Sequence, residues 1–211
     1  MATRAQTNGP GARRSAAASR RQTPAGEKVL AAASRLFYDK GIQAVGVELI
    51  AAEAQVTKKT LYDRFRSKDE LIVAYLEERD ERWRADLRAL LAQHHGDPKA
   101  QLLAAFDALQ AWTAAGSDRG CAFARACTDL PADHPGQQVA RQHKSWLLAR
   151  LREAADAADA ADPRTLAEQL LMLHDGACAA TVSRAALDPV AGARQAARVL
   201  IDNACGGKQS K

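Results

Sequence analysis

The stretch IAAEAQVTKKTLYDRFRSKDEL, residues 50–71, decides the fold of this chain. Its first residues continue an apolar pattern with steps of three and four, which predicts a short helix over residues 47–54. After a two-residue turn, a second short helix is predicted over residues 58–65, with Leu61 and Phe65 facing inward. Two short helices joined by a tight turn form a helix-turn-helix, a unit that lays its second helix in the major groove of DNA.

Helix signals flank this stretch on both sides. Thr23 is placed to cap a preceding helix that has proline at its first position and ends at Gly41. Ser67 and Glu70 have the spacing of a capping box, which predicts the start of a much longer helix that ends near residues 94–98.

The rest of the chain predicts more helices and no strands. Aromatic residues make up 5% of the chain and alanine is abundant, a composition that favours helices packed through small side chains. Prolines mark the starts of most of the amphipathic segments, which cover residues 98–116, 121–130, 135–158, 163–187 and 189–204. We therefore expect an all-α protein.

Positive charge is concentrated at the N-terminal end. Residues 1–70 contain 13 Lys and Arg against 7 Asp and Glu, whereas the other 141 residues are close to neutral. This asymmetry indicates that one end faces a polyanion. Residues 1–22 resemble an organelle transit peptide in composition, but they equally suit a disordered basic arm on DNA. Without a membrane span or a secretory signal, a soluble cytoplasmic protein is expected.

The outward face of the second short helix supplies the candidate DNA contacts. Lys59 and Thr60 are expected to read bases, because lysine donates to guanine and threonine offers a hydroxyl and a methyl group. Asp63 either accepts from cytosine or orients Lys59 four residues earlier, and we favour the second role. The expected phosphate contacts are Thr57, Lys58, Tyr62, Lys68, Arg20 and Arg21.

The residues from Ile50 to Leu71 resemble the tetracycline-repressor (TetR) family, with the resemblance covering about residues 27–75. The family pattern I-A-x-x-A-x-V-[ST]-x-x-x-L-Y-x-x-F-x-[SN]-K-x-x-L is met at nearly every position. Two residues depart from it. Gln55 stands where glycine is usual in the turn, so an uncommon backbone geometry is expected there, and Gly46 replaces the usual Thr or Ser cap.

The resemblance implies a homodimer with a ligand pocket in its C-terminal part and an inducer that weakens operator binding. It implies a three-helix DNA-binding domain (23–67) and a helical ligand-binding and dimerisation domain (68–205). Composition adds a disordered basic tail before them (1–22), and a frayed C-terminal tail (206–211) is expected after them. By position, the helices over residues 163–187 and 189–204 are the dimerising pair. Packing of these helices within one subunit is the alternative.

Large or polar side chains on otherwise apolar helices are candidates to line the ligand pocket, namely Trp112, Phe123, Trp146, Met172 and His174. Ordinary core packing is the alternative for each of them. The four cysteines lack metal-ligand spacing and have apolar neighbours, which favours buried reduced thiols. No cofactor is expected.

The sequence thus predicts a regulator that binds a pseudo-palindromic operator as a homodimer and is released by a small-molecule inducer of unknown identity. No membrane partner is expected. A DNA-binding regulator without ligand sensing is the first alternative. A small helical enzyme or ligand-binding protein is a remote one, because no glycine-rich phosphate loop, metal-spaced cluster or nucleophile motif is visible.

Overall fold

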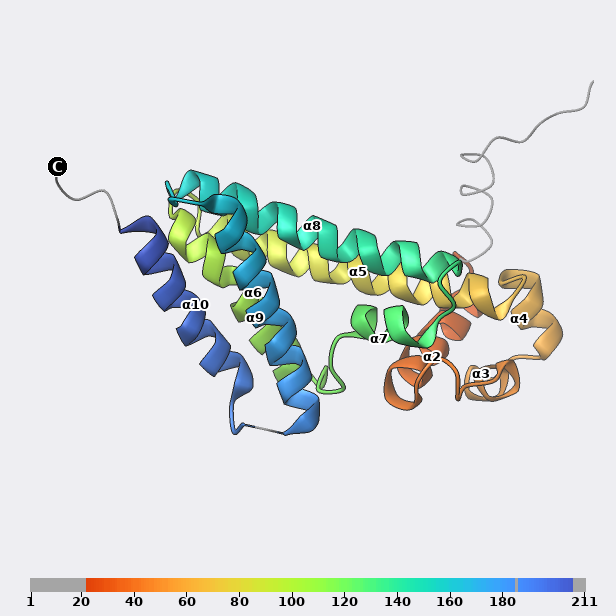
Figure 1. Ribbon diagram of the computed structural model, residues 1–211. Helices are drawn as coiled ribbons and strands as arrows, with labels where there is room; N and C mark the ends of the chain where they lie inside the picture. The colour runs from red at the N-terminus through yellow and green to blue at the C-terminus, as the bar shows by residue number, and fades with distance from the viewer. Residues whose placement is uncertain (1–21, 185, 207–211) are drawn as a thin grey trace, which may run out of the picture. The chain divides into compact units, whose positions relative to one another are not determined.

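The computed structural model describes residues 22–184 and 186–206 of the 211-residue chain. Within these ranges it contains nine helices and no strand, so the all-α prediction is confirmed (Figure 1). The helices form two compact units, one ending at Tyr75 and the other beginning at Leu76. The division lies inside α5 (Lys68–Gln93), whereas the boundary expected after residue 67 coincides with the start of that helix.

The first unit consists of α2 (Pro24–Lys40), α3 (Val47–Glu53), α4 (Lys58–Arg64) and the first turns of α5. The N-cap of α2 is as predicted, because the Thr23 hydroxyl accepts a hydrogen bond from the Gly26 N–H at 3.1 Å. Its C-terminal end is also as predicted. Gly41 closes the helix at a φ of 93°, a conformation that glycine adopts without a steric penalty.

A common core holds α2, α3 and α4 of the first unit together. The side chains of Phe37, Ile50, Leu61 and Phe65 are at most 1% exposed. Burial of each such side chain contributes about 1.5–3 kcal/mol. Since α2 contacts both α3 and α4, this core fixes the two short helices against a longer one.

The second unit contains the rest of α5 together with α6 (Pro98–Ala114), α7 (Ala122–Asp129), α8 (Pro135–Ala157), α9 (Pro163–Ser183) and α10 (Pro189–Cys205). Proline occupies the start of four of these helices, as predicted, and an aspartate caps three of them. The capping carboxylates of Asp97, Asp162 and Asp188 each accept a backbone N–H three residues later at 3.0 Å.

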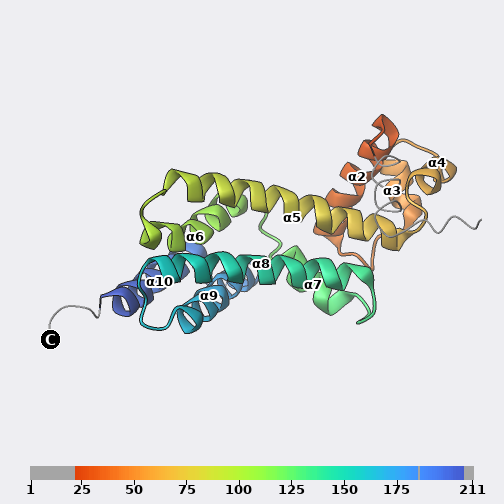
Figure 2. The same cartoon turned by 90° about the horizontal axis from the view of Figure 1, so that it is seen from above.

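Helix α9 is central to the second unit, because it packs against both α8 and α10. Helix α6 contacts α8 and α10 in turn, and α7 packs on α8. The part of α5 after Leu76 runs beside α8 in both views (Figures 1 and 2). The largest fully buried side chains of this core include Leu102, Phe106, Leu147, Leu170 and Ile201.

Helix α9 ends at Ser183, four residues before the predicted end at residue 187. Arg184 has a left-handed φ of 52°, which stops the helix, and Asp188 with Pro189 then starts α10. None of the described helices is both long and apolar enough to cross a membrane.

Candidate nucleic-acid interface and ligand cavity

The turn between α3 and α4 has the uncommon backbone geometry that was predicted from Gln55, which stands where glycine is usual. Gln55 lies in the left-handed region with a φ of 55°, which costs a non-glycine residue about 1–2 kcal/mol. The N–H groups of Gln55 and Val56 donate to the carbonyls of Ala52 and Ala51 at 3.1 and 3.0 Å. The end of α3 is therefore satisfied by backbone hydrogen bonds without a glycine. At the other end of α3, Gly46 is the N-cap and makes no side-chain cap, as its lack of a side chain requires.

Helix α4 is held by its cap and by its inward side. The Thr57 hydroxyl accepts the Thr60 N–H at 3.0 Å and lies 2.9 Å from the Thr60 hydroxyl. Leu61 and Phe65 are fully buried. This packing leaves the opposite side of α4 on the surface, and this side carries the predicted base contacts.

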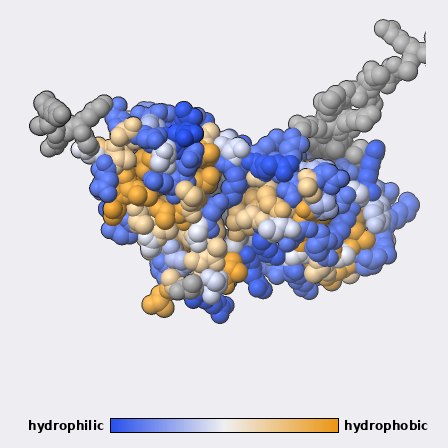
Figure 3. Space-filling model, viewed as in Figure 1, coloured by the Kyte–Doolittle hydropathy of each residue, from blue (hydrophilic) through white to orange (hydrophobic). Residues whose placement is uncertain are grey.

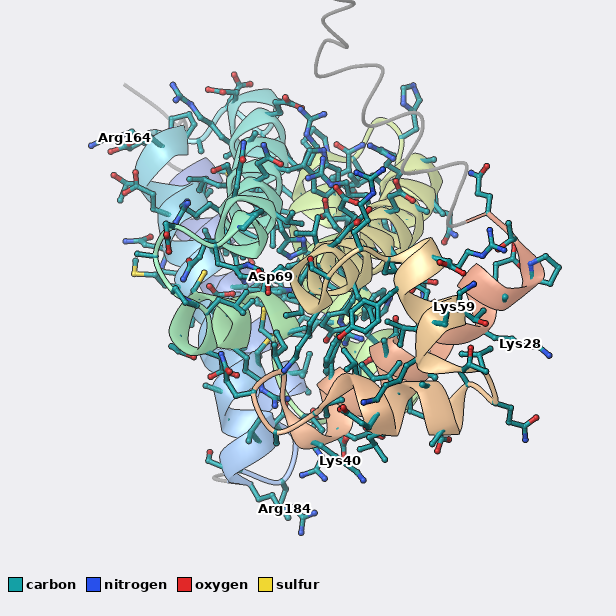
Figure 4. The ribbon with its side chains drawn as sticks, turned by 90° about the vertical axis from the view of Figure 1, so that its right-hand side faces the viewer. Lys28, Lys40, Lys59, Asp69, Arg164 and Arg184 are labelled. Atoms are coloured by element: carbon teal, nitrogen blue, oxygen red, sulfur yellow. The ribbon has the colours of Figure 1, made fainter. Side chains whose placement is uncertain are left out.

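Lys59 is the most exposed of these candidates, with 88% of its side chain accessible (labelled in Figure 4). Its ammonium nitrogen lies 3.8 Å from Asp63 Oδ2, one turn further along the helix. This pairing is the role favoured for Asp63 over contact with cytosine. Thr60 is half-buried, and its hydroxyl is already engaged with Thr57.

Lys58, a predicted phosphate contact, pairs with a residue of the preceding helix. Its ammonium lies 2.5 Å from Glu48 Oε1. This hydrogen bond raises the pKa of Lys58 and lowers the pKa of Glu48, so both groups stay charged at neutral pH. Lys58 must exchange this carboxylate for a phosphate in order to hold DNA. No local sequence pattern indicates this pair, because ten residues and a turn separate its members.

The other predicted phosphate contacts lie around the two helix starts. Tyr62 is exposed on α4, and Lys68 is the half-buried first residue of α5. The predicted capping box is present in modified form. Ser67 Oγ accepts the Glu70 N–H at 3.0 Å, whereas Glu70 Oε2 accepts the N–H of Arg66, one residue before the cap. Arg20 and Arg21 lie outside the described residues.

The second unit contains a cavity between α5, α6, α7, α8 and α9 that encloses about 460 Å³ between its side chains, solvent-open space included. Three of the five predicted pocket residues line it, namely Trp112, Phe123 and His174. Trp146 does not, because it lies under the guanidinium groups of Arg84 and Arg88, at 4.8 and 5.5 Å from its ring. Met172 is 65% exposed on α9 and lies elsewhere.

The cavity wall carries polar groups that periodicity does not reveal. His143 Nδ1 lies 2.8 Å from Asp80 Oδ1, and the His143 ring stacks on Phe123 with centroids 3.7 Å apart. Burial lowers the pKa of His143, although the Asp80 hydrogen bond opposes this shift. Burial acts to raise the pKa of Asp80, but hydrogen bonds from His143 and Arg84 outweigh it and the pKa is lowered. At neutral pH the imidazole of His143 is therefore neutral and the carboxylate of Asp80 is ionised.

Two ring nitrogens at this cavity are buried and have no hydrogen-bond partner within the described part of the chain, Trp83 Nε1 and His174 Nε2. An unsatisfied buried polar atom costs about 1–3 kcal/mol, so each such atom in a folded protein calls for an explanation. The two rings are neighbours, with centroids 5.5 Å apart in an edge-to-face arrangement.

Two cysteines also line the cavity, Cys121 and Cys178. Burial raises the pKa of Cys178 to about 12, so its thiol stays protonated at neutral pH and is a poor nucleophile. All four cysteines are free thiols, but burial is as expected for Cys178 alone: Cys121 and Cys205 are partly buried, and Cys127 is exposed on α7. Helix α7 is short, and only one side of it packs on α8.

The outer side of α9 and α10 exposes apolar side chains. Met172 is 65% exposed and Val199 is 51% exposed. Between them runs a groove lined by small residues that include Gly176, Ala180, Gly192 and Ala193. A Cβ atom added at either glycine meets nothing within 4 Å, so backbone of another molecule can come close. Figure 3 shows hydrophobic side chains gathered over these two helices.

Comparisons with known proteins agree with this architecture. Residues 29–75 match the model of the family described as bacterial regulatory proteins, tetR family. A TetR-family transcriptional regulator from Streptomyces coelicolor has a crystal structure that superposes with a TM-score of 0.76, at 30% identity over 89% of this chain and 97% of that one. A putative TetR-type regulator from Streptomyces avermitilis gives a TM-score of 0.71, at 32% identity over 88% of this chain and 99% of that one.

A curated relative is also a helix-turn-helix transcriptional regulator. The HTH-type transcriptional regulator YjdC of Escherichia coli is 27% identical over 154 residues, which cover 71% of this chain and 79% of that protein. The helix-turn-helix of the first unit, the helical second unit and these likenesses together show that the chain belongs to the TetR family of transcriptional regulators.

Proposed function

We propose that this regulator is a repressor, not an enzyme, that binds a pseudo-palindromic operator as a homodimer and is released by a small molecule. The observation that carries the proposal is α4, a capped helix whose buried Leu61 and Phe65 leave Lys59 on an exposed outer side. Such a helix can enter the major groove with its polar side toward the bases.

Charge on the first unit supports this orientation. Lys58 and Lys59 both lie in the first turn of α4, and Lys68 begins α5. In the proposed complex Lys59 and Thr60 contact bases, with Asp63 holding Lys59, while Thr57, Lys58, Tyr62 and Lys68 contact phosphates. The hydroxyl of Thr57 already caps α4, so its phosphate contact uses the remaining lone pair or proton. Arg20 and Arg21 lie outside the described residues, and their phosphate contacts remain a prediction.

The partner that we propose for the apolar side of α9 and α10 is a second copy of the chain. A monomer that left Met172 and Val199 on the surface would expose a continuous apolar patch, which soluble proteins generally avoid. Two copies meeting through this side give a two-fold axis, as a palindromic operator requires. The two α4 helices then reach half-sites about one helical turn of DNA apart, about 34 Å, or more.

The cavity in the second unit supports release by a ligand. It is largely apolar and has a few polar atoms, as is usual for sites that bind small molecules. A ligand weakens operator binding only if it binds more tightly to a conformation other than the DNA-bound one. A regulator that binds DNA without sensing a ligand is the alternative, and the unsatisfied nitrogens at the cavity favour the ligand-responsive form.

Selection from a random double-stranded DNA library with the full-length protein tests the proposal. We expect enrichment of a sequence with two-fold symmetry, bound with a stoichiometry of one dimer or more per site. Placed between a promoter and a reporter gene, this operator should lower expression when the protein is present. An increase in expression would assign the protein as an activator instead, and the absence of any enriched sequence would overturn the proposed operator binding.

A further inference from the structure

The ammonium group of Lys58, in the first turn of α4, is engaged by a carboxylate of the preceding helix. Its nitrogen lies 2.5 Å from Glu48 Oε1, and both side chains are more than half exposed. The hydrogen bond between them is the largest cause of the raised pKa of Lys58 and of the lowered pKa of Glu48. Both groups are therefore charged at neutral pH, and Lys58 meets DNA with a negative partner already in place.

The absence of a side chain at Gly46 makes room for this carboxylate. Gly46 is the N-cap of α3, two residues before Glu48. A Cβ atom added at Gly46 would lie 3.2 Å from Glu48 Oε2, which is closer than most Cβ contacts in proteins. One oxygen of the carboxylate thus lies beside the N-cap of α3, while the other contacts Lys58. Gly46, which replaces the usual Thr or Ser cap, and Glu48 therefore form one arrangement that engages Lys58.

The first unit has few positive charges in excess. Residues 22–75 contain 8 Lys and Arg against 7 Asp and Glu, so the described part of this unit is close to neutral. The positive excess of residues 1–70 comes mainly from the arginines before residue 22. Since attraction to DNA depends on Lys and Arg that neutralise phosphates, the engagement of a single lysine of the folded unit changes its affinity for DNA.

A DNA phosphate and the Glu48 carboxylate make the same kind of contact with Lys58. Each presents an anionic oxygen to the compact charge of the ammonium group. An ammonium that held both would bring two anions together, and their repulsion opposes this. The contact with DNA therefore replaces the contact with Glu48. The Lys59–Asp63 pair differs, because its 3.8 Å spacing is longer than a hydrogen bond and leaves the donors of Lys59 available to a base.

We propose that Glu48 is a positioning residue of the DNA-binding unit, which holds Lys58 in the free protein and competes with DNA phosphate for its ammonium group. The competition lowers affinity for every duplex alike, because phosphates carry no sequence information. DNA binding must break an exposed ion pair, and pairs of this kind contribute up to about fivefold to an equilibrium constant. The inference rests on the proposed operator binding, since Glu48 acts through one of the proposed phosphate contacts.

The test compares Glu48→Gln with Glu53→Gln in the full-length protein. Both changes remove one negative charge from α3, but Glu53 pairs with Arg35 of α2, which is not among the proposed phosphate contacts. Fluorescence anisotropy at low salt gives the affinities for the selected operator and for a scrambled duplex. We expect E48Q to bind both duplexes about two- to fivefold more tightly per half-site than E53Q. A gain of less than about twofold, weaker binding by E48Q, or a gain confined to the operator would overturn the proposal.

A second pair of variants shows whether Glu48 acts through Lys58. In a Lys58→Ala background the competition is absent, so E48Q should bind DNA no more tightly than E53Q in the same background. A gain that persists without Lys58 shows that Glu48 repels phosphate directly, and it contradicts the competition. The pKa of Lys58, followed by NMR of its side chain without DNA, should be lower in E48Q than in the unaltered protein. An unchanged pKa of Lys58 would mean that Glu48 does not hold it in solution.

Failure of this inference and failure of the proposed function give different results. If the unaltered protein prefers its operator but E48Q gains nothing over E53Q, the competition is wrong and operator binding stands. If no variant distinguishes the operator from the scrambled duplex, the proposed operator binding is wrong. A gain by E48Q on both duplexes, lost in the Lys58→Ala background, would still support competition for phosphate.

Discussion

Lys59 Nζ lies 3.8 Å from Asp63 Oδ2, one turn further along α4, and both side chains are more than half exposed. A carboxylate on the DNA-facing side of a helix repels phosphate unless it has a positive partner. Lys59 supplies that partner on the surface of α4. In the proposed complex, Lys59 contacts a base while the Asp63 carboxylate stays beside its ammonium group.

Replacement of Lys59 by alanine should reduce both operator affinity and sequence preference. A lost contact to guanine costs about 1–3 kcal/mol per half-site, about 5- to 150-fold in affinity. The measurement is fluorescence anisotropy with the selected operator and with operators changed at single positions. We expect the loss to be largest on the selected operator and smaller on the altered ones.

Two further variants show whether this loss is specific to a base contact. Lys58→Ala should weaken binding to all sequences alike and reduce the slope of log affinity against log salt by about 0.9 per lost phosphate contact. Lys99→Ala removes a lysine from α6 in the second unit and should change neither quantity. If Lys59→Ala behaves like Lys58→Ala, Lys59 is a phosphate contact.

In the first unit, sequence patterns predict the local features of the helices but not the contacts between helices. The start of α4, its Thr57 cap and its buried Leu61 and Phe65 were all predictable, because caps and helical periodicity are local. The Lys58–Glu48 ion pair was not predictable, since it depends on the angle at which α3 and α4 cross. Local rules set which side of a helix is buried, whereas tertiary geometry sets its partners.

In the second unit, sequence patterns do not predict the tertiary neighbours of individual side chains. Trp112, Trp146 and Met172 look alike in sequence, as large side chains on amphipathic helices. The structure places one at the cavity, one beneath arginines of α5 and one on the exposed side of α9. Periodicity states that a residue is on the apolar side of its own helix but does not state which helix lies opposite. His143 and Trp83 escaped prediction for the same reason.

Replacement of Gln55 by glycine should stabilise the first unit. Its φ of 55° is strained for glutamine and free of strain for glycine, so the free energy of unfolding should rise by about 0.5–1 kcal/mol. Gln195→Gly is the matched control, because Gln195 is exposed within α10, where glycine lowers stability by about 1 kcal/mol. Urea denaturation should give opposite signs for the two variants. A loss of stability in both would show that the turn is not strained.

Replacement of Met172 by glutamate should separate the proposed dimer. Met172 lines the groove between α9 and α10, and in a dimer its substitution buries a charge without a partner, which costs several kcal/mol at each of two equivalent positions. Light scattering coupled to size exclusion measures the mass directly. Gln195→Glu adds the same charge to α10 at a residue that does not line the groove, and should leave the mass unchanged. A monomeric unaltered protein would overturn the proposed dimer, and an M172E protein that remains dimeric would place the interface elsewhere.

Stability should fall as the pH drops from about 7.5 to about 5, because of the two buried histidines. Burial lowers the pKa values of His143 and His174 below the ordinary 6.5, although Asp80 and Asp175 oppose the shifts and Lys144 adds to them. Below pH 6.5 the unfolded chain therefore takes up protons that the folded protein resists, so the free energy of unfolding decreases. Each histidine contributes at most about 1.4 kcal/mol per pH unit.

The carboxylates that face these histidines change their contribution to stability over a different pH range. The pKa values of Asp80 and Asp175 are lowered from 3.8, so the stability that they contribute is lost only as the pH falls below that value. A loss of stability between about pH 6.5 and about pH 5 thus reports the histidines. Urea denaturation of the H174F variant should show a smaller decrease over this range than the unaltered protein. The same change at the exposed His95 serves as the control and should not reduce the decrease. If the H174F and H95F variants lose stability equally with falling pH, His174 takes up its proton as readily in the folded protein as in the unfolded chain.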